Sequence, residues 1–198
     1  MTNLLQQTFQ KIDEENAKDP NAEQWQGKSY PKELLYAQRM TNRLNLYAPN
    51  ASEELQIAAR AQHIKRWEIP REDFAMDKAG YHKWRNTLKS FHAGQVAEIM
   101  QAVGYKESSI DRVKFLVEKK KLKKDADTQM LEDVICFVFL EYYLDDFATT
   151  KSEEKIIDIL QKTWQKISDR AKGQLDSLSM SDESRRLVQK ALSASDGS

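Results

Sequence analysis

Residues 130–144 of the chain read MLEDVICFVFLEYYL. Apart from Glu132, Asp133 and Glu141, every residue of this stretch is apolar or aromatic, so a helix formed by it would be hydrophobic on all sides. Helices of that kind are buried at the centre of a protein, because they have no polar face to turn towards water. The stretch therefore predicts the central helix of a helical fold.

The rest of the chain has the same helical character. Its 198 residues include only six glycines and four prolines, and its apolar residues recur every three or four positions. No segment alternates apolar and polar residues for long, as a half-buried strand would. We expect an all-α fold, a single bundle of about seven or eight helices. The expected helices are 2–18, 32–47, 50–67, 79–103, 107–124, 128–147, 153–172 and 183–193.

The residues between these helices predict how the chain is divided. Residues 21–31 are expected to form a loop and residues 71–78 an irregular connection. Asn50, with Glu53 three residues later, resembles a capping box, and Ser108 and Ser152 are further candidate caps. Gly104 stands where a helix commonly ends. We expect one domain over residues 1–172, followed at 173–198 by a linker, a short helix and a flexible tail.

Charge and composition narrow the class of protein. The 31 Lys and Arg residues balance the 31 Asp and Glu residues, which gives no strong nucleic-acid signal. The run EKKKLKK at 118–124 is interpreted as a solvated helix end, since cations favour that end of the helix dipole. Cys136 is the single cysteine, so an intrachain disulfide is excluded. No signal peptide and no membrane-spanning apolar run is recognised, and a cytoplasmic protein is expected.

Asp133 is the first candidate for a functional residue. One turn to either side of it lie Met130, Cys136 and Phe137, so its carboxylate is expected to point into apolar surroundings. Burying an ionised carboxylate costs several kcal/mol unless it is paired or bound to a metal. A buried Arg partner is the ordinary explanation, and a metal ion or an activated water is the alternative.

His63 is the second candidate, in the tract AARAQHIKRW at 58–67. On the expected helix it shares a face with Arg60, Arg66 and Trp67. Arginine suits bidentate binding of phosphate or carboxylate, and Arg–carboxylate pairs within the protein would give the same pattern. An anionic site is therefore one interpretation, and a structural histidine donating to a carbonyl is the other. Further arginines stand near predicted helix faces or bends, namely Arg39, Arg71 and Arg85.

His92 is the third candidate, in KSFHAGQVAEIM at 89–100. It is in line with Leu88, Val96 and Ile99 on the inner face of the expected helix. Taken alone, this pattern favours a histidine at the edge of the core. His82 is expected to be exposed and is assigned no role.

The order of several tracts resembles the HD-domain superfamily of all-helical, metal-dependent phosphohydrolases. The tracts are LLYAQRM at 34–40, AARAQHIKRW at 58–67, FHAGQVAEIMQAVG at 91–104, RVKFLVEKK at 112–120 and TQMLEDVICFVFLE at 128–141. By this resemblance, His63 corresponds to the His of the His–Asp doublet and Asp133 to the final Asp. His92 falls in the region of the later ligands, and Arg39 on the Arg of the first helix.

The resemblance also has departures. Ile64 stands where the doublet has its Asp, and Tyr36 where the family has its first His. The resemblance implies a site for a divalent metal (Mn, Fe, Zn or Ni), whose ligands would be His63, His92 and Asp133, with Glu132 as a further candidate.

Over about residues 30–165 the chain is also similar to an uncharacterised family in bacteria and fungi. That family is catalogued as a domain of unknown function and is sometimes labelled glutamyl-tRNA-synthetase-like. The likeness is carried by AARAQHIKRWEIPR at 58–71, GYHKWR at 80–85, SFHA at 90–93 and LEDVICFVFLEYY at 131–143. No nucleotide-binding strand–loop–helix pattern supports the synthetase label.

Three functions follow from these patterns. The first is an HD-like metal-dependent phosphohydrolase or nucleotide-handling protein, with Glu132 and Asp133 as catalytic residues. It would act on a small phosphate-containing ligand, which would be held by Arg39, Arg60, Arg66, Arg71, Arg85 and Lys121. The second is a catalytically degenerate HD-like fold that binds an anionic ligand or a protein partner without hydrolysis. The third is a helical interaction module that uses Trp25, Trp67, Trp84 and Trp164 as anchors, and a second copy of the chain is one expected partner.

Overall fold

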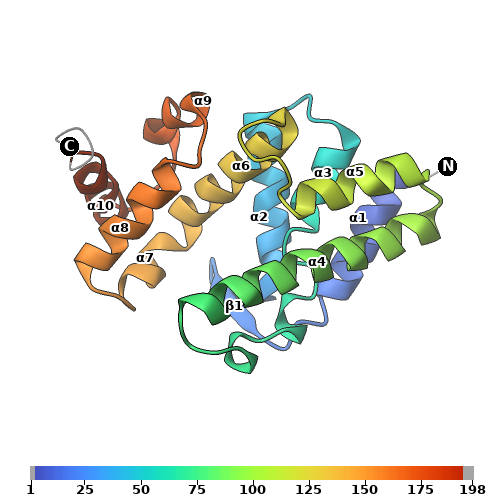
Figure 1. Cartoon of the computed structure of the whole chain (residues 1–198), viewed down its shortest axis with the longest axis horizontal. Helices are drawn as coiled ribbons and strands as arrows, with labels where there is room; N and C mark the ends of the chain where they lie inside the picture. Colours follow the sequence, from blue (N-terminus) through green and yellow to red (C-terminus); the bar gives the residue numbers. More distant parts are fainter. Residues whose placement is uncertain (1–2, 194–198) are drawn as a thin grey trace. The chain divides into compact units, whose positions relative to one another are not determined.

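A computed structural model describes residues 3–193 of the chain, which divide into two compact units, 3–120 and 121–193 (Figure 1). Both units are built mainly of helices, which confirms the predicted all-α class. The HD-like arrangement of the helices stays a prediction. The predicted boundary at residue 173 falls within the second unit, and residues 194–198 of the predicted tail lie outside the described part.

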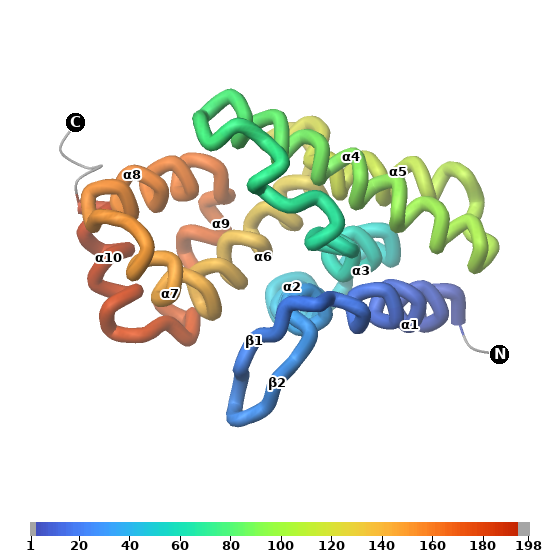
Figure 2. The backbone as a smooth tube through the Cα atoms, turned by 90° about the horizontal axis from the view of Figure 1, so that it is seen from below, coloured from blue at the N-terminus to red at the C-terminus, as the bar shows by residue number. Residues whose placement is uncertain are grey.

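The first unit is a helical bundle with one small hairpin. Its α4 packs along α5 and α1, and α3 packs on α5, α2 and α1 (Figures 1 and 2). The core includes the fully buried Met40, Leu55, Val96 and Leu116 from four of these helices. The elements are α1 Leu4–Asn16, β1 Ala22–Trp25, β2 Lys28–Pro31, α2 Lys32–Tyr47, α3 Glu53–Arg60, α4 Lys78–Val103 and α5 Glu107–Val117.

The segment expected as a loop at 21–31 is instead an antiparallel β-hairpin. Trp25 pairs with Lys28 across a two-residue turn, Gln26–Gly27, in which both φ angles are positive, at 49° and 75°. Such turns match the twist of the flanking strands, and glycine adopts the second angle without steric cost. Each strand has only four residues, too few for a clear alternating pattern. The hairpin lies directly before α2 in the chain, and β1 and β2 both contact that helix (Figure 2).

The helix predicted over 50–67 ends at Arg60, and its N-cap is Ser52, which accepts from the Leu55 N–H, and not Asn50. Residues 61–65 form turns, and Lys65 has a left-handed φ of 53°. The buried Asn16 side chain accepts from the Lys65 N–H at 3.0 Å, which holds this turn in place. His63 and Arg66 therefore lie after the helix, and not on a shared helical face.

The helix predicted over 107–124 is also shorter, since α5 ends at Val117 and Lys106, not Ser108, is the N-cap residue. The run EKKKLKK follows directly after the end of this helix as a series of turns, so it is not helical itself. The other ends agree with the sequence. Gly104 closes α4 with a φ of 101°. Ser152 is the N-cap of the helix Glu153–Trp164.

The second unit has α6 as its longest helix, and α10 packs against α8 and α7. The side chains of Leu131, Val134, Phe137 and Val138 are fully buried, as the apolar pattern predicted. The helix predicted over 153–172 is broken, because Ser168 begins a new helix by accepting from the Ala171 N–H. The elements are α6 Ala126–Tyr142, α7 Leu144–Ala148, α8 Glu153–Trp164, α9 Asp169–Lys172 and α10 Asp182–Ser193.

Between residues 3 and 193, none of the helices combines the length and the apolar character that a membrane span requires.

Candidate functional site: a histidine and arginine cluster

His63 is the centre of a polar cluster in the first unit. Its Nδ1 lies 3.1 Å from the Oε2 of Glu33, which comes from the first turn of α2. Its Nε2 lies 3.2 Å from a terminal guanidinium nitrogen of Arg66. Arg66 also approaches the other Glu33 oxygen at 3.8 Å, so the three side chains form a closed set.

The partners fix the protonation of the His63 ring. A carboxylate accepts hydrogen bonds and a guanidinium only donates them, so Nδ1 carries the proton and Nε2 presents its lone pair. The pKa of His63 lies well below its ordinary value, first because the ring is buried and then because Arg66 is close. The imidazole is therefore neutral, with one nitrogen oriented by Glu33 and the other covered by Arg66.

Two further rings belong to this cluster. Tyr36 stacks on His63 with ring centroids 3.9 Å apart and planes 10° apart. His92, from α4, lies 6.1 Å from His63 between ring centroids. Its Nδ1 donates to the Ile64 carbonyl at 2.7 Å, while its Nε2 is buried and has no hydrogen-bond partner among residues 3–193. We refer to Glu33, Tyr36, His63, Arg66, Arg85 and His92 as the His63 cluster.

Positive charge exceeds negative charge around His63. Besides Arg66, the side chains of Arg85, Lys119 and Lys32 all lie close enough to lower the pKa of the ring. In the described part of the chain, no carboxylate lies within ion-pair distance of Arg85. Burial raises the pKa of Glu33 to about 7, although Arg66 and Lys32 act in the opposite direction. Near neutral pH the single acid of the cluster is therefore only partly ionised and offsets part of the positive charge.

The residues of the His63 cluster do not fit a divalent metal ion. The lone pair of His63 Nε2 is taken by Arg66, and four cations surround that ring. His92 Nε2 is a suitable nitrogen, but structural and catalytic sites need three or four protein ligands. Across the described residues, no group of three or more His, Cys, Asp or Glu side chains could hold a metal ion.

The other predicted arginines have contacts of their own. Arg39 pairs with Glu23 of the hairpin at 2.5 Å, and its guanidinium lies over the Trp25 ring at 5.4 Å. Arg71 donates to the carbonyls of Phe74 and Ala75, at 2.9 and 2.7 Å. Arg39 thus connects α2 to the hairpin, and Arg71 stabilises the connection before α4.

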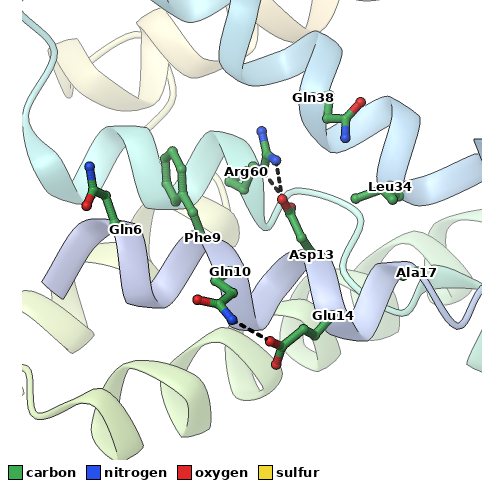
Figure 3. A pocket seen from close by; sticks show the side chains of 9 residues that line it. All are labelled: Gln6, Phe9, Gln10, Asp13, Glu14, Ala17, Leu34, Gln38 and Arg60. Atoms are coloured by element: carbon green, nitrogen blue, oxygen red, sulfur yellow. Dashed lines mark hydrogen bonds and ion pairs between the residues drawn. The ribbon is translucent and has the colours of Figure 1, made fainter. Parts of the chain in front are cut away.

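Arg60 lies on a separate groove formed by α1, α2 and α3 (Figure 3). It donates to both oxygens of Asp13, at 2.8 and 2.5 Å, and to the Thr41 hydroxyl at 3.1 Å. The groove has a volume of about 580 Å³ and is widely open. Since Arg60 is held by a bidentate carboxylate pair at its edge, the groove offers a ligand no unused positive charge.

Asp133 and Glu132 belong to α6 of the second unit. The Asp133 carboxylate accepts from the Ser168 N–H at 2.8 Å, from the Ser168 hydroxyl at 2.6 Å and from the Gln129 amide at 3.0 Å. These hydrogen bonds stabilise the buried carboxylate, and the arginine partner suggested by the sequence stays a prediction. Lys121, the last predicted ligand-binding residue, is exposed in the turns before α6.

Residues 6–188 match the family model described as a domain of unknown function, DUF4202. The chain belongs to the DUF4202 family. This confirms the uncharacterised family recognised from the sequence tracts. No curated protein and no solved structure is significantly similar to the chain.

Sequence reasoning missed the acid of the cluster in this DUF4202 protein. Glu33 lies three residues before Tyr36, so on α2 both face the same side. By the HD-domain resemblance Tyr36 corresponds to a ligand position, and an acid one turn away from it is a usable signal. Glu33 is only 6% exposed, which its place beside Lys32 at the start of a helix did not suggest.

Proposed function

We propose that this DUF4202 protein binds a small phosphate-containing molecule at the His63 cluster. The observation that carries the proposal is a neutral imidazole with two half-buried guanidinium groups beside it, Arg66 and Arg85, and one acid, Glu33, whose nearest approach to Arg66 is 3.8 Å. Partly burying two guanidinium groups beside one acid is unfavourable unless an anion accompanies them. A phosphate group supplies that charge and several acceptor oxygens.

Arg66 supports the proposal through the weakness of its present contacts. One contact is to a neutral ring nitrogen at 3.2 Å, and the other, at 3.8 Å, is beyond hydrogen-bond distance. Its guanidinium lies over the Trp84 ring, 4.8 Å from the ring centroid, and this contact holds the plane of the guanidinium in place. A guanidinium fixed in this way binds two phosphate oxygens at little cost in side-chain entropy.

The chemistry available without a metal ion supports ligand binding better than hydrolysis. His92 can accept a hydrogen bond through Nε2, which has no partner among residues 3–193, from a hydroxyl or a protonated phosphate of the ligand. This corresponds to the anion-binding, catalytically degenerate protein that the sequence suggested as an alternative. The metal-dependent phosphohydrolase stays a prediction, in which Asp133 and Glu132 would act.

Isothermal titration calorimetry with inorganic phosphate and a nucleoside monophosphate tests the proposal. We expect saturable binding in the presence of EDTA, and a loss of at least tenfold in affinity in Arg66→Gln and in Arg85→Gln. Arg186→Gln is the matched control, because it removes the same charge from an exposed ion pair in the second unit. Equal affinities in all of these proteins would contradict the proposal. Stoichiometric metal in the purified protein, lost in His63→Ala, would favour the metal-dependent enzyme instead.

A further inference from the structure

The lysine-rich turn, residues 118–124, has an unusual backbone. The φ angle is positive at Lys119, Lys121 and Lys123, at 57°, 54° and 71°, and negative at the residues between them. Glu118, at the start, is in the right-handed helical region, with φ −73° and ψ −6°. The left-handed region is unfavourable for residues with a Cβ atom, and glycine or asparagine normally occupies it. The chain instead places lysine at all three positions.

Backbones that alternate in this way turn successive N–H groups towards the same side, which forms an anion-binding concavity. The first donors of the turn are used, since the N–H groups of Lys119 and Lys120 bond the Leu116 and Phe115 carbonyls. In the part of the chain that the structure describes, the N–H groups of Lys121, Leu122 and Lys123 donate to no protein acceptor. Three consecutive donors are thus available to a ligand.

The side chains add positive charge at the same place. Lys120 pairs with Glu118 at 2.5 Å. By contrast, Lys121, Lys123 and Lys124 have no carboxylate within ion-pair distance in the range 3–193. Lys121 and Lys123 are exposed, so an anion can reach them from solvent. Unpaired lysines beside unused N–H donors are the two components of many phosphate sites.

We infer that the lysine-rich turn is a phosphate-binding site, in which the N–H groups of residues 121–123 hold the phosphate oxygens and Lys121 and Lys123 balance their charge. The site then explains the strained backbone, because this conformation directs the N–H donors towards the phosphate. Glycine would adopt the conformation more easily, but it would not supply the positive charge of the lysines. The ligand class is a phosphate or pyrophosphate group of a small molecule. This inference uses other residues than the proposed function and does not depend on it.

Titration of the full chain with inorganic phosphate and with pyrophosphate, followed by amide NMR, tests the inference. We expect saturable shifts of the amide signals of residues 121–123. The variant Lys121→Gly/Lys123→Gly removes both charges but accommodates the left-handed backbone, so it folds at least as stably as the wild type. Its affinity at these amides should be at least tenfold weaker. Lys155→Ala/Lys162→Ala, which removes two exposed lysines from α8, should change the affinity less than twofold.

Three results would overturn the inference: amide signals that do not move, shifts that rise without saturation, or equal affinities in the two double variants. Repeating the titration in Arg66→Gln separates the two proposals. Signals of residues 121–123 that still respond there support the turn as an independent site. If they no longer respond, the turn has no phosphate site of its own.

Discussion

Tyr36 and His63 form a parallel stack, with ring centroids 3.9 Å apart and an interplanar angle of 10°. The two residues come from α2 and from the turn after α3, so the stack joins two segments that are distant in sequence. It also fixes the plane of the imidazole, while Glu33 fixes its rotation by accepting from Nδ1. The neutral ring is thereby held in one orientation.

A double-mutant cycle should measure this stack. Tyr36→Leu, His63→Ala and the double variant are compared with the wild type by urea unfolding at neutral pH. We expect a coupling free energy of about 0.5–1.5 kcal/mol, the usual value for aromatic pairs beyond the area that they bury. A coupling energy indistinguishable from zero would mean that the rings are neighbours without stabilising each other.

The raised pKa of Glu33, about 7, predicts a pH-dependent stability. Between the ordinary carboxyl pKa, about 4.3, and about 7, the folded protein binds this proton and the unfolded chain does not. Stability contributed by Glu33 is therefore lost as the pH rises through that window. Glu33→Gln does not titrate, and its amide oxygen still accepts from His63. Its unfolding free energy should rise relative to the wild type by a few kcal/mol from about pH 5 to pH 7.

The two histidines change the unfolding free energy with pH in the direction opposite to Glu33. The prediction therefore concerns the difference in unfolding free energy between Glu33→Gln and the wild type, in which the histidine contributions cancel. The pKa values of His63 and His92 lie well below the ordinary value, first because both rings are buried. Below about pH 6.5 the unfolded chain takes up more protons than the folded one, so both proteins lose stability in acid. A difference between Glu33→Gln and the wild type that stays constant with pH would contradict the assigned pKa.

The Arg60–Asp13 pair predicts a structural role for Arg60. Its guanidinium contacts Asp13 of α1 and Thr41 of α2, and its side chain is 11% exposed. Arg60→Ala leaves both partners without their donor, and we expect a loss of about 2 kcal/mol in urea unfolding. Arg186→Ala, from an exposed pair, should cost less than 1 kcal/mol. If the two variants lose equal stability, the Arg60 pair is no stronger than a surface pair.

The helical pattern predicted the fold class because apolar spacing reports directly on which residues are buried. The fully buried face of α6 and the glycine end of α4 followed from residue types alone. The early end of α3 could not be predicted in this way. It depends on the Asn16 side chain, 49 residues away in sequence, which accepts from the Lys65 N–H. Long-range hydrogen bonds of this kind leave no periodic signal.

The candidate site was predicted in part. His63 and the nearby arginines stood out because polar residues are unusual beside the alanines of 58–61. The proximity of His92 and Arg85 to His63 depends on the packing of α4 in the first unit, which one sequence does not contain. The partners of Asp133 were missed because Ser168 reaches it only after the chain breaks between α8 and α9.

Asp133 should act as a structural acceptor in the second unit, because its carboxylate receives the backbone and hydroxyl donors of Ser168 at the start of α9. Asp133→Ala leaves these buried donors unsatisfied, and we expect a loss of about 2–3 kcal/mol in urea unfolding, since bonds to a charged group are strong. Ser168→Ala keeps the backbone donor and should lose about half as much. If Asp133→Ala keeps its stability but loses bound metal or phosphate-releasing activity, the carboxylate serves chemistry and not the fold.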